Sequence, residues 1–409
     1  MAEEKVLVVG AGAAGMLAAI LFAQRGCLVH VFEQNEKLGK KLFITGKGRC
    51  NLTNACEKTE DLLGAVVSNP KFLYSSFSQC DNWKIMEFFE NLGVPLKVER
   101  GGRVFPKSDK SSDVIRAMER KMKELGVKIH LKSRVKRLLA ADTRVQGIAL
   151  ENGATMEGDR VVIATGGLSY PSTGADGSGY AFAKSVGHTI IQPIPSLAPL
   201  LVPEGYVRRL QGLSLRNIRF SVWAGKKCLY EEFGEMLFTH HGVSGPVALS
   251  ASAVIGRKLR ETPLTARIDL KPALSEEQLD ARLLREFEKS PNKRLKNVAD
   301  SLYPASLTPV MIQLSGIPDK PVHEVSRQER RKLLEVTKAF PMTIEGVAGF
   351  QEAIVTKGGV SVREIHPSTM ESRKVPGLYI IGEALDVDAL TGGYNLQIAW
   401  STAWAAANA

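Results

Sequence analysis

Three glycines near the start of the chain, Gly10, Gly12 and Gly15, have the spacing of a turn that receives a phosphate group. In a G-x-G-x-x-G turn the first glycine permits the tight bend, the second lets backbone approach a pyrophosphate, and the third lets a helix pack closely on a strand. Glu33, eighteen residues after Gly15, can accept hydrogen bonds from ribose hydroxyls. These residue types predict a dinucleotide site; a purely structural glycine turn is the alternative.

The elements around these residues are those that such a site needs. A β-rich run at 5–9 leads into the glycines, an apolar Ala-rich segment follows, and a second β-rich run at 29–32 ends on Glu33. The expected order is strand, glycine turn, helix, strand, acid. The start of the helix offers free N–H groups and a positive dipole end to the phosphates.

A loop rich in Gly, Lys and Asn, residues 39–54, comes directly after this unit. We expect it to run beside the cofactor. The pyrophosphate would be neutralised by Lys40, Lys41, Lys47 and Arg49. Backbone N–H groups of the loop would reach the flavin or nicotinamide end of the cofactor. A basic surface loop without this role is the alternative.

Two cysteines in and after this loop, Cys50 and Cys56, have the spacing C-x5-C. Flavin-dependent disulfide reductases place a redox pair as C-x4-C, so we expect two ordinary thiols, with a redox disulfide as the alternative. The five cysteines of the chain are odd in number and do not cluster in pairs, which favours a reducing compartment.

A second cofactor signature is expected near residue 165. Strands with turns at Asp142-Thr143-Arg144 and Asn152-Gly153 predict a β-meander, and a continuous apolar strand at 160–163 then ends in Ala164-Thr165-Gly166-Gly167. Small residues there permit close backbone approach. Together with the opening turn, this signature favours FAD over NAD.

The closing segment supplies the other half of the expected site. A buried strand at 377–381 ends in Gly382-Glu383, which can bind the ribityl hydroxyls, and the final helix at 396–407 can stabilise negative charge at the flavin O2/N1 edge. An ordinary helix at the sheet edge is the alternative. The residues that we expect to contact the cofactor are Gly10, Gly12, Ala13, Ala14, Gly15, Glu33, Gln34, Lys40, Lys41, Thr45, Gly46, Gly48, Arg49, Cys50, Asn51, Val135, Ala164, Thr165, Gly166, Gly167, Gly382, Glu383, Asp386, Gly393, Tyr394, Asn395 and Leu396.

Side chains that could act on a substrate are less well specified. The candidates near the flavin are Lys357, Tyr394, His240, Tyr170 and Arg103. The adjacent histidines at 240 and 241 lack Cys or carboxylate partners at ligand spacing, so we expect no metal site. A role of His240 as general acid or base, or in substrate positioning, competes with a structural turn before the following Gly-Pro.

The fold class expected is α/β, with a Rossmann-like FAD-binding domain of the two-dinucleotide type. Prolines cluster after residue 191 and the pattern changes there to short alternating strands. We expect residues 1–191 and 344–409 to form the FAD-binding domain, and 192–343 to be an inserted β-rich and helical module that covers the cofactor, with its helical part at about 250–302.

Composition sets the class of protein. The chain has 409 residues, 44% hydrophobic and 24% charged, which is ordinary for a globular protein, and a net charge of +11. Basic residues are dense at 116–137, but two glutamates interrupt them and no aromatics are interleaved, which favours a solvated helix face over a nucleic-acid surface. We expect no signal peptide, no membrane span and no nucleic-acid partner, and a cytoplasmic location; the oligomeric state is not specified.

The segments at 37–54, 164–180, 239–246, 356–360 and 377–403 together resemble, nearly end to end, one bacterial family of NAD(P)/FAD-dependent oxidoreductases. This family includes aminoacetone oxidases and gut-bacterial flavoproteins that are proposed to reduce 3-oxo-4-ene bile-acid intermediates. The resemblance implies a Rossmann-like FAD domain with a β-rich domain and a small helical domain inserted before the C-terminal return. It does not settle the chemistry, because members have been assigned different reactions.

The expected reaction passes a hydride between flavin N5 and a small organic substrate. No second glycine fingerprint follows the first, so NADH or NADPH would bind only transiently at the flavin. The inserted module is large enough to enclose a bulky substrate, which favours an NAD(P)H-dependent reductase of an enone-type C=C bond. The alternatives are an amine oxidase that produces hydrogen peroxide, a tRNA-associated flavoprotein, and a flavin carrier without turnover.

Overall fold

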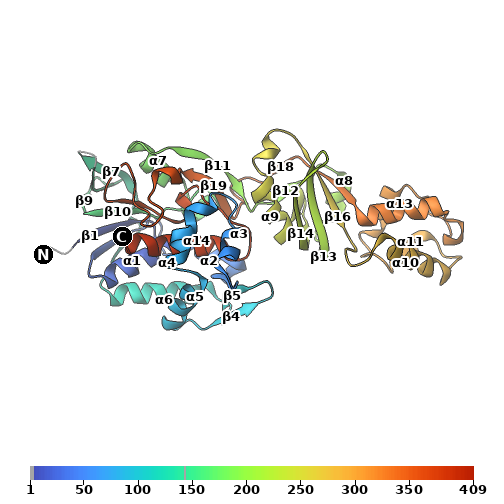
Figure 1. The fold of residues 1–409 in the computed structure, drawn as a ribbon, viewed down its shortest axis with the longest axis horizontal. Helices are drawn as coiled ribbons and strands as arrows, with labels where there is room; N and C mark the ends of the chain where they lie inside the picture. The colour runs from blue at the N-terminus through green and yellow to red at the C-terminus, as the bar shows by residue number, and fades with distance from the viewer. Residues whose placement is uncertain (1–3, 142–143) are drawn as a thin grey trace. The chain divides into compact units, whose positions relative to one another are not determined.

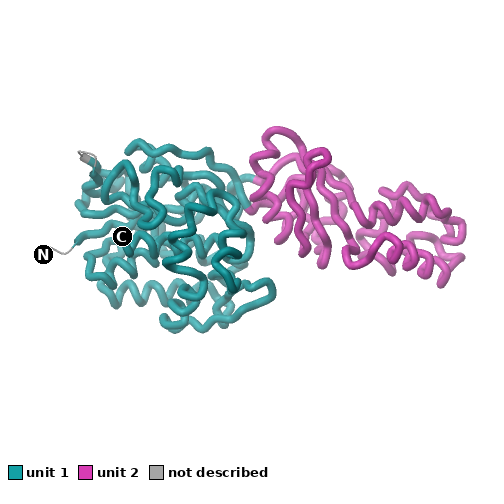
Figure 2. The backbone as a smooth tube through the Cα atoms, in the orientation of Figure 1, with its two compact units in different colours: residues 1–196, 349–409 teal, residues 197–348 magenta. Residues whose placement is uncertain are grey.

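The computed structural model describes residues 4–141 and 144–409, which fall into two compact units (Figure 2). Unit 1 comprises the residues up to 196 together with 349–409, and unit 2 comprises 197–348. Each unit has a hydrophobic core of its own. These boundaries each lie five residues beyond the expected 192 and 343. The difference arises because strand β11 (Ile190–Ser196), which contains two of the clustered prolines, pairs with β19 (Val355–Val360) inside unit 1.

The centre of unit 1 is a five-stranded parallel sheet with the order β20-β10-β1-β2-β6. Its strands are β20 (Leu378–Ile380), β10 (Arg160–Ile163), β1 (Lys5–Val9), β2 (Leu28–Phe32) and β6 (Lys128–His130). Val9 is in register with both Ile163 and Phe32, and Ile163 with Ile380, so four strands end at one edge of the sheet. The predicted α/β class with a Rossmann-like sheet is confirmed. Ligands of such sheets bind at this carboxyl edge.

Two apolar helices lie against this sheet and against each other, α1 (Ala13–Gln24) and α14 (Tyr394–Ala407) (Figure 1). Both are Ala-rich and almost entirely buried, as expected for helices that are apolar on every side. Because α1 follows β1 and α14 follows β20, the beginning and the end of the chain meet in one core.

Besides the β11–β19 pair, the described residues of unit 1 form two three-stranded sheets. The predicted meander is present as β7 (Val135–Ala141), β8 (Arg144–Leu150) and β9 (Thr155–Glu157), whereas its expected first turn at Asp142-Thr143-Arg144 falls on residues 142 and 143, outside the described residues. The other sheet has the order β3-β5-β4 and consists of β3 (Thr53–Asn54), β5 (Arg103–Pro106) and β4 (Leu96–Glu99).

The helical segment at 70–91 is interrupted at Cys80-Asp81. The segment consists of the 3-10 turn η1 (Pro70–Leu73), α4 (Tyr74–Gln79) and α5 (Asn82–Asn91). Asp81 Oδ1 accepts a hydrogen bond from Lys84 N at 2.9 Å, so this side chain caps α5 and starts a new helix. The remaining helices of unit 1 are α2 (Lys40–Gly48), α3 (Thr59–Gly64), α6 (Ser111–Glu124) and α7 (Ser178–Ser185).

Unit 2 combines a seven-stranded sheet with a set of helices. The sheet has the order β17-β16-β13-β14-β15-β12-β18, formed by β12 (Leu200–Leu201), β13 (Ser214–Ala224), β14 (Lys227–Phe238), β15 (Gly242–Ser244), β16 (Leu264–Asp269), β17 (Phe340–Ile344) and β18 (Gly346–Val347). The helices are α8 (Gly205–Arg209), α9 (Pro246–Ile255), α10 (Glu276–Glu288), α11 (Leu295–Ala299), α12 (Thr308–Ser315) and α13 (Arg327–Lys338).

The helical part of unit 2 differs from the expected range of about 250–302. Strand β16 lies inside that range, and two further helices, α12 and α13, follow it. Leu264, Ala266 and Ile268 are buried in β16 while the residues between them are exposed. This alternation has the period of a strand with one buried face, which the sequence analysis missed.

Candidate functional site

The glycine turn between β1 and α1 has the geometry that its sequence predicts. Gly10 has φ of +99°, in the left-handed region that favours glycine, and a methyl group on it would lie 2.6 Å from the carbonyl oxygen of Ala164 on the next strand. A methyl group on Gly15 would overlap the carbonyl oxygen of Gly10. The close approach of α1 to the turn therefore requires glycine at both positions.

The middle glycine of the turn borders open space. Nothing lies within 4 Å of the place where a side chain on Gly12 would project, and Gly12 is the N-cap of α1. No side chain caps α1, and its first turn contains no acidic residue. The first N–H groups of the helix and the positive end of its dipole are thus left for an anion.

Glu33 lies buried just beyond β2 and holds two loops with its carboxylate. Oε2 accepts a hydrogen bond from Ala11 N at 2.9 Å, and Oε1 accepts from Asn35 N at 2.8 Å and from Asn35 Nδ2 at 2.7 Å. Oε2 can accept a second bond, whereas Oε1 already accepts two. Its neighbour Gln34 donates from Nε2 to the carbonyl oxygen of Gly174 at 2.6 Å.

The segment expected as a loop at 39–54 begins as helix α2. Its backbone then passes from the right-handed helical region to left-handed conformations. Thr45 leaves the helical region, Gly46 and Lys47 are left-handed, and Gly48 and Cys50 also have positive φ. Left-handed conformations at Lys47 and Cys50 cost energy for residues with a Cβ, and such strain gathers at functional sites. Cys50 N donates to the carbonyl oxygen of Thr45 at 3.0 Å, which closes this turn.

Lys41 and Glu383, from opposite ends of the chain, form an ion pair. Lys41 Nζ lies 2.9 Å from Glu383 Oε1 and 2.7 Å from Oε2, and both side chains are about one-fifth exposed. Glu383 Oε1 also accepts from Thr356 N at 3.0 Å. The hydroxyl of Thr356 accepts in turn from the N–H groups of Leu168 and Ser169. Strand β19 thus joins the two predicted cofactor segments.

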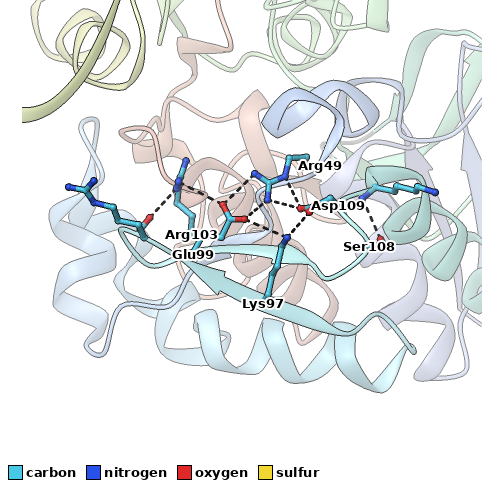
Figure 3. A network of polar contacts seen from close by, with 8 residues as sticks. Arg49, Lys97, Glu99, Arg103, Ser108 and Asp109 are labelled. Atoms are coloured by element: carbon cyan, nitrogen blue, oxygen red, sulfur yellow. Dashed lines mark hydrogen bonds and ion pairs between the residues drawn. The ribbon is translucent and has the colours of Figure 1, made fainter. Parts of the chain in front are cut away.

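Lys40 and Arg49 of the same segment are engaged elsewhere, and Lys47 is exposed. Lys40 Nζ lies 3.2 Å from Asn35 Oδ1. The guanidinium of Arg49 pairs with Glu99 and Asp109 (Figure 3). It also lies 4.1 Å over the ring of Phe105. The structure therefore brings Lys41 to Glu383 but holds Lys40 and Arg49 in separate contacts.

The Ala164–Gly167 segment follows β10 at the same edge of the sheet. Gly166 has φ of +73°, and a side chain on Gly167 would overlap the hydroxyl of Thr356 and meet Glu383. The hydroxyl of Thr165 is buried and has no hydrogen-bond partner among the described residues, and the same holds for Asn51 Oδ1. Two polar atoms are thus left for a group that the protein itself does not provide.

The start of α14 closes the site. Gly393, its N-cap, has φ of +102°, and a side chain there would overlap the carbonyl oxygen of Thr53 on β3. No side chain caps the helix, and its first turn lacks acidic residues. Asn395 receives a hydrogen bond from Ala389 N at 3.0 Å and donates to the carbonyl oxygen of Ala389 at 2.8 Å. Asn395 thus fixes the loop that leads into the helix.

Lys357 and Asp388 form a buried ion pair beside this loop. Lys357 Nζ lies 3.1 Å from Asp388 Oδ1, and the two side chains are 7% and 0% exposed. Asp388 Oδ2 also accepts from the hydroxyl of Ser196, at 2.9 Å. Buried charges of this kind are retained only when they are paired and hydrogen-bonded.

The remaining candidate side chains lie in different surroundings. Tyr394 is the first residue of α14 and is partly exposed. Tyr170 has φ of +52°, which is uncommon for a bulky residue, and Arg103 is exposed on β5. His240 belongs to unit 2, where it is exposed and its Nδ1 lies 3.3 Å from Gln211 Oε1. The prediction that His240 acts at the flavin stays a prediction.

The cysteine pair is not a disulfide, because Cys50 and Cys56 are both free thiols. Burial raises the pKa of the Cys50 thiol to about 12, although a hydrogen bond with Thr45 opposes the shift. At neutral pH this thiol is protonated and unreactive. The structure therefore agrees with the prediction that Cys50 and Cys56 are two ordinary thiols.

Several polar contacts that support the site were not anticipated. Thr53 Oγ1 lies 2.6 Å from Gln397 Oε1, Trp400 Nε1 donates to the carbonyl oxygen of Leu52, and Asn69 Nδ2 lies 3.0 Å from Asp386 Oδ2. Gln397 lies within the quoted C-terminal motif, one residue beyond the residues assigned to the cofactor. The sequence signal that could have identified Gln397 was its position in the first turn of the final helix.

The residues present fit a dinucleotide such as FAD. The fit rests on the open space at Gly12, on the uncapped helix starts of α1 and α14, and on the unpartnered buried atoms of Thr165 and Asn51. Within residues 4–141 and 144–409, no group of three or more His, Cys, Asp or Glu could hold a metal ion, and no helix is long and apolar enough to span a bilayer.

Comparison with known proteins decides the family. The model of the HI0933-like protein Rossmann domain matches residues 4–409. The chain belongs to the HI0933-like family. HI0933-like proteins are FAD-dependent oxidoreductases, so the resemblance found in the sequence is confirmed, and the chain is an enzyme of this class.

This HI0933-like chain is similar to two relatives with named activities and to one solved structure. It is 34% identical to a 3-dehydro-bile acid delta(4,6)-reductase from Clostridium scindens, over 99% of this chain and 98% of the relative. It is 32% identical to a ribosomal RNA dihydrouridine synthase from Escherichia coli K12, over 98% and 96%. A 3-ketosteroid delta1-dehydrogenase from Sterolibacterium denitrificans shares the fold, with a TM-score of 0.52, 15% identity and 98% coverage of both chains.

Proposed function

We propose that this HI0933-like protein is an NAD(P)H-dependent reductase of a C=C bond conjugated to a carbonyl group. The observation that carries the proposal is the similarity over nearly the whole chain to a bile-acid delta(4,6)-reductase. The Escherichia coli relative supports the same chemistry, because dihydrouridine is uridine with its C5=C6 bond saturated, and that bond is conjugated to the C4 carbonyl. When bound, FAD supplies the two-electron chemistry that such a reduction requires.

The residues of unit 1 would hold FAD along the carboxyl edge of the parallel sheet. We assign the pyrophosphate to the start of α1 beside Gly12, and the ribose of the adenosine half to Glu33. We assign the flavin half to Thr165, to Glu383 and to the uncapped start of α14. The positive dipole end of α14 would favour negative charge at the flavin edge.

Tyr394 is the side chain that we propose as proton donor to the substrate carbon next to the carbonyl. It opens α14, beside the expected flavin edge, and it is partly exposed, so a substrate can reach it. Lys357 is nearly buried and bound to Asp388, and we assign it the positioning of the 385–393 loop that precedes α14.

A second candidate function follows from the Escherichia coli relative, whose name describes a reaction on ribosomal RNA. The net charge of +11 suits a polyanionic substrate. In this version the conjugated C=C bond belongs to a uridine in RNA, and the residues at the flavin keep the same roles.

The electron donor separates the reductase from the amine oxidase. Purified protein with bound FAD is mixed anaerobically with NADH, with NADPH and with aminoacetone, and the flavin absorbance is followed. The proposal requires rapid bleaching by one of the nicotinamides and none by the amine. Bleaching by aminoacetone, with peroxide formed after air is admitted, would instead establish the oxidase.

The five free cysteines support a reducing compartment, for which we propose the cytoplasm.

A further inference from the structure

The loop at 45–51 and the strands β4 and β5 with their connections, residues 96–110, carry an unusual share of positive charge. These two stretches contain seven Lys and Arg against two acidic residues, a net charge of +5, whereas the net charge of the whole chain is +11. We call them the basic hairpin surface. Its basic residues are Lys47, Arg49, Lys97, Arg100, Arg103, Lys107 and Lys110.

The two acids of the basic hairpin surface hold its central cations in place. Arg49 pairs with both Glu99 and Asp109, and Lys97 Nζ lies 2.6 Å from Asp109 Oδ2 (Figure 3). Phe105 packs beneath the guanidinium of Arg49. The network fixes the strands to the 45–51 loop, and it takes up both negative charges of the surface.

The other cations of the basic hairpin surface face solvent. The exposed cations are Lys47, Arg100, Arg103, Lys107 and Lys110. They are spread over the loop, the β4–β5 turn and the segment after β5. A small monoanion needs one or two such groups at one point, whereas cations spread along a surface match a row of phosphates.

The basic hairpin surface lies beside the segment that we propose to hold the flavin edge. Asn54 Nδ2 donates to the carbonyl oxygen of Gly101 in the β4–β5 turn at 2.9 Å, and to that of Gly392, just before α14, at 3.2 Å. Thr53 of the same strand is paired with Val104 of β5. When a ligand is bound along the hairpin, the parts of the ligand that extend beyond the hairpin therefore lie next to the start of α14.

We propose that the basic hairpin surface binds the sugar-phosphate backbone of single-stranded RNA, and that the reducible C=C bond belongs to a base of that strand. This inference rests on the proposed function and names its substrate class. A base splayed from a single strand can enter a site that a paired base cannot reach. The exposed cations would hold the flanking phosphates while the base lies at the flavin edge.

The test uses the full-length FAD-loaded protein and a fluorescein-labelled single-stranded oligouridylate. The hairpin variant R100Q/K107Q/K110Q is compared with the control variant R116Q/R120Q/K123Q, which removes the same charge from exposed positions on α6. Fluorescence anisotropy gives Kd across a salt series. We expect the hairpin variant to bind about tenfold or more weakly, and the slope of log K against log salt to shrink by about 2, which corresponds to about 0.7 for each lost phosphate contact.

Equal weakening in both variants, or no binding by the wild type, would overturn the RNA surface. Unchanged RNA binding by the hairpin variant would also overturn it. NAD(P)H-dependent reduction of a small enone is measured on the same samples and should be equal in all three proteins. If enone reduction occurs without RNA binding, the inference fails and the proposed function stands. If RNA binding depends on the hairpin but neither the enone nor the oligouridylate reoxidises the reduced flavin, the proposed function fails and the RNA-binding surface stands. Unchanged flavin absorbance in both variants controls for folding.

Discussion

Lys41 Nζ lies 2.7 Å from Glu383 Oε2, although the two residues are 342 positions apart in the chain. Lys41 belongs to α2, just after the first glycine turn, and Glu383 follows β20, the last strand of the parallel sheet. Thr356 N donates to the same carboxylate, and a side chain on Gly167 would meet it. One carboxylate thus joins the first, middle and last segments of unit 1 at the carboxyl edge of the sheet.

Substitution G12A tests the pyrophosphate assignment. The backbone of Gly12 has ordinary negative φ and nothing lies within 4 Å of the new methyl group, so the fold should accept it. The methyl group would enter the space assigned to the pyrophosphate, and we expect FAD to bind at least about tenfold more weakly, or about 1.4 kcal/mol. Calorimetric titration of apoprotein with FAD measures this.

The matched control is G64A, which also adds a methyl group in open space. It should leave FAD affinity unchanged, and both variants should keep the melting temperature of the apoprotein. Wild-type FAD affinity in G12A would remove the assignment.

Breaking the Lys357–Asp388 pair should destabilise the protein strongly. Because both side chains are almost fully buried, K357M or D388N alone leaves one charge without its partner, at a cost of about 3–5 kcal/mol. The double variant should lose less than the sum of the two. Urea unfolding of the apoprotein gives the three values, and single-variant losses below about 1 kcal/mol would contradict a buried charge pair.

His188 predicts a dependence of stability on pH. Its Nε2 lies 2.8 Å from the hydroxyl of Ser372, and its Nδ1 lies 3.1 Å from Glu364 Oε2. The hydroxyl of Ser372 accepts two backbone N–H groups, so its own proton faces Nε2 and the imidazole is neutral, with its proton on Nδ1. Burial lowers the pKa of His188, although Glu364 opposes the shift.

A lowered pKa in the folded state means that the unfolded chain takes up the proton first. The contribution of His188 is therefore complete above about pH 6.5, the ordinary pKa of histidine, and is lost as pH falls below it. The stability difference between wild type and H188Q should be about 1–3 kcal/mol at neutral pH and should shrink in acid. The control variant is H323Q, at an exposed histidine. A difference that grows in acid would contradict the neutral imidazole.

Substitution Y394F separates proton donation from flavin reduction. The phenylalanine ring keeps the packing at the start of α14 and removes the hydroxyl. We expect the rate of flavin reduction by NAD(P)H to be unchanged and the rate of substrate reduction to fall by about 10²–10⁴. Stopped-flow absorbance measures both half-reactions. Y74F, at an exposed tyrosine of α4, is the control. Equal rates for Y394F and wild type in the second half-reaction would exclude Tyr394.

The parallel sheet and its glycine turn could be predicted because their signals are local. Gly10, Gly15 and Glu33 lie within a single strand–helix–strand unit, and the requirements of the turn are steric, so the residue types alone express them. The continuous apolar run of β10 also identified a buried parallel strand.

Contacts between distant segments could not be predicted in this way. The pairing of Lys41 with Glu383 depends on the register of strands far apart in sequence, and basic residues near a phosphate loop look alike whether they face a ligand or an acid. Arg49 was assigned to the pyrophosphate, but the structure engages it with Glu99 and Asp109.

The most direct test of the proposed function is the reoxidation of the reduced protein. FAD-loaded protein is reduced anaerobically with NADPH or NADH and then mixed with a 4-en-3-oxo steroid or with the matching saturated 3-oxo steroid. We expect the enone to restore the oxidised flavin spectrum with one equivalent of saturated product, and the saturated ketone to have no effect. A flavin that stays reduced with the enone, and also with a single-stranded oligouridylate, but is reoxidised by oxygen would contradict a reductase of conjugated C=C bonds.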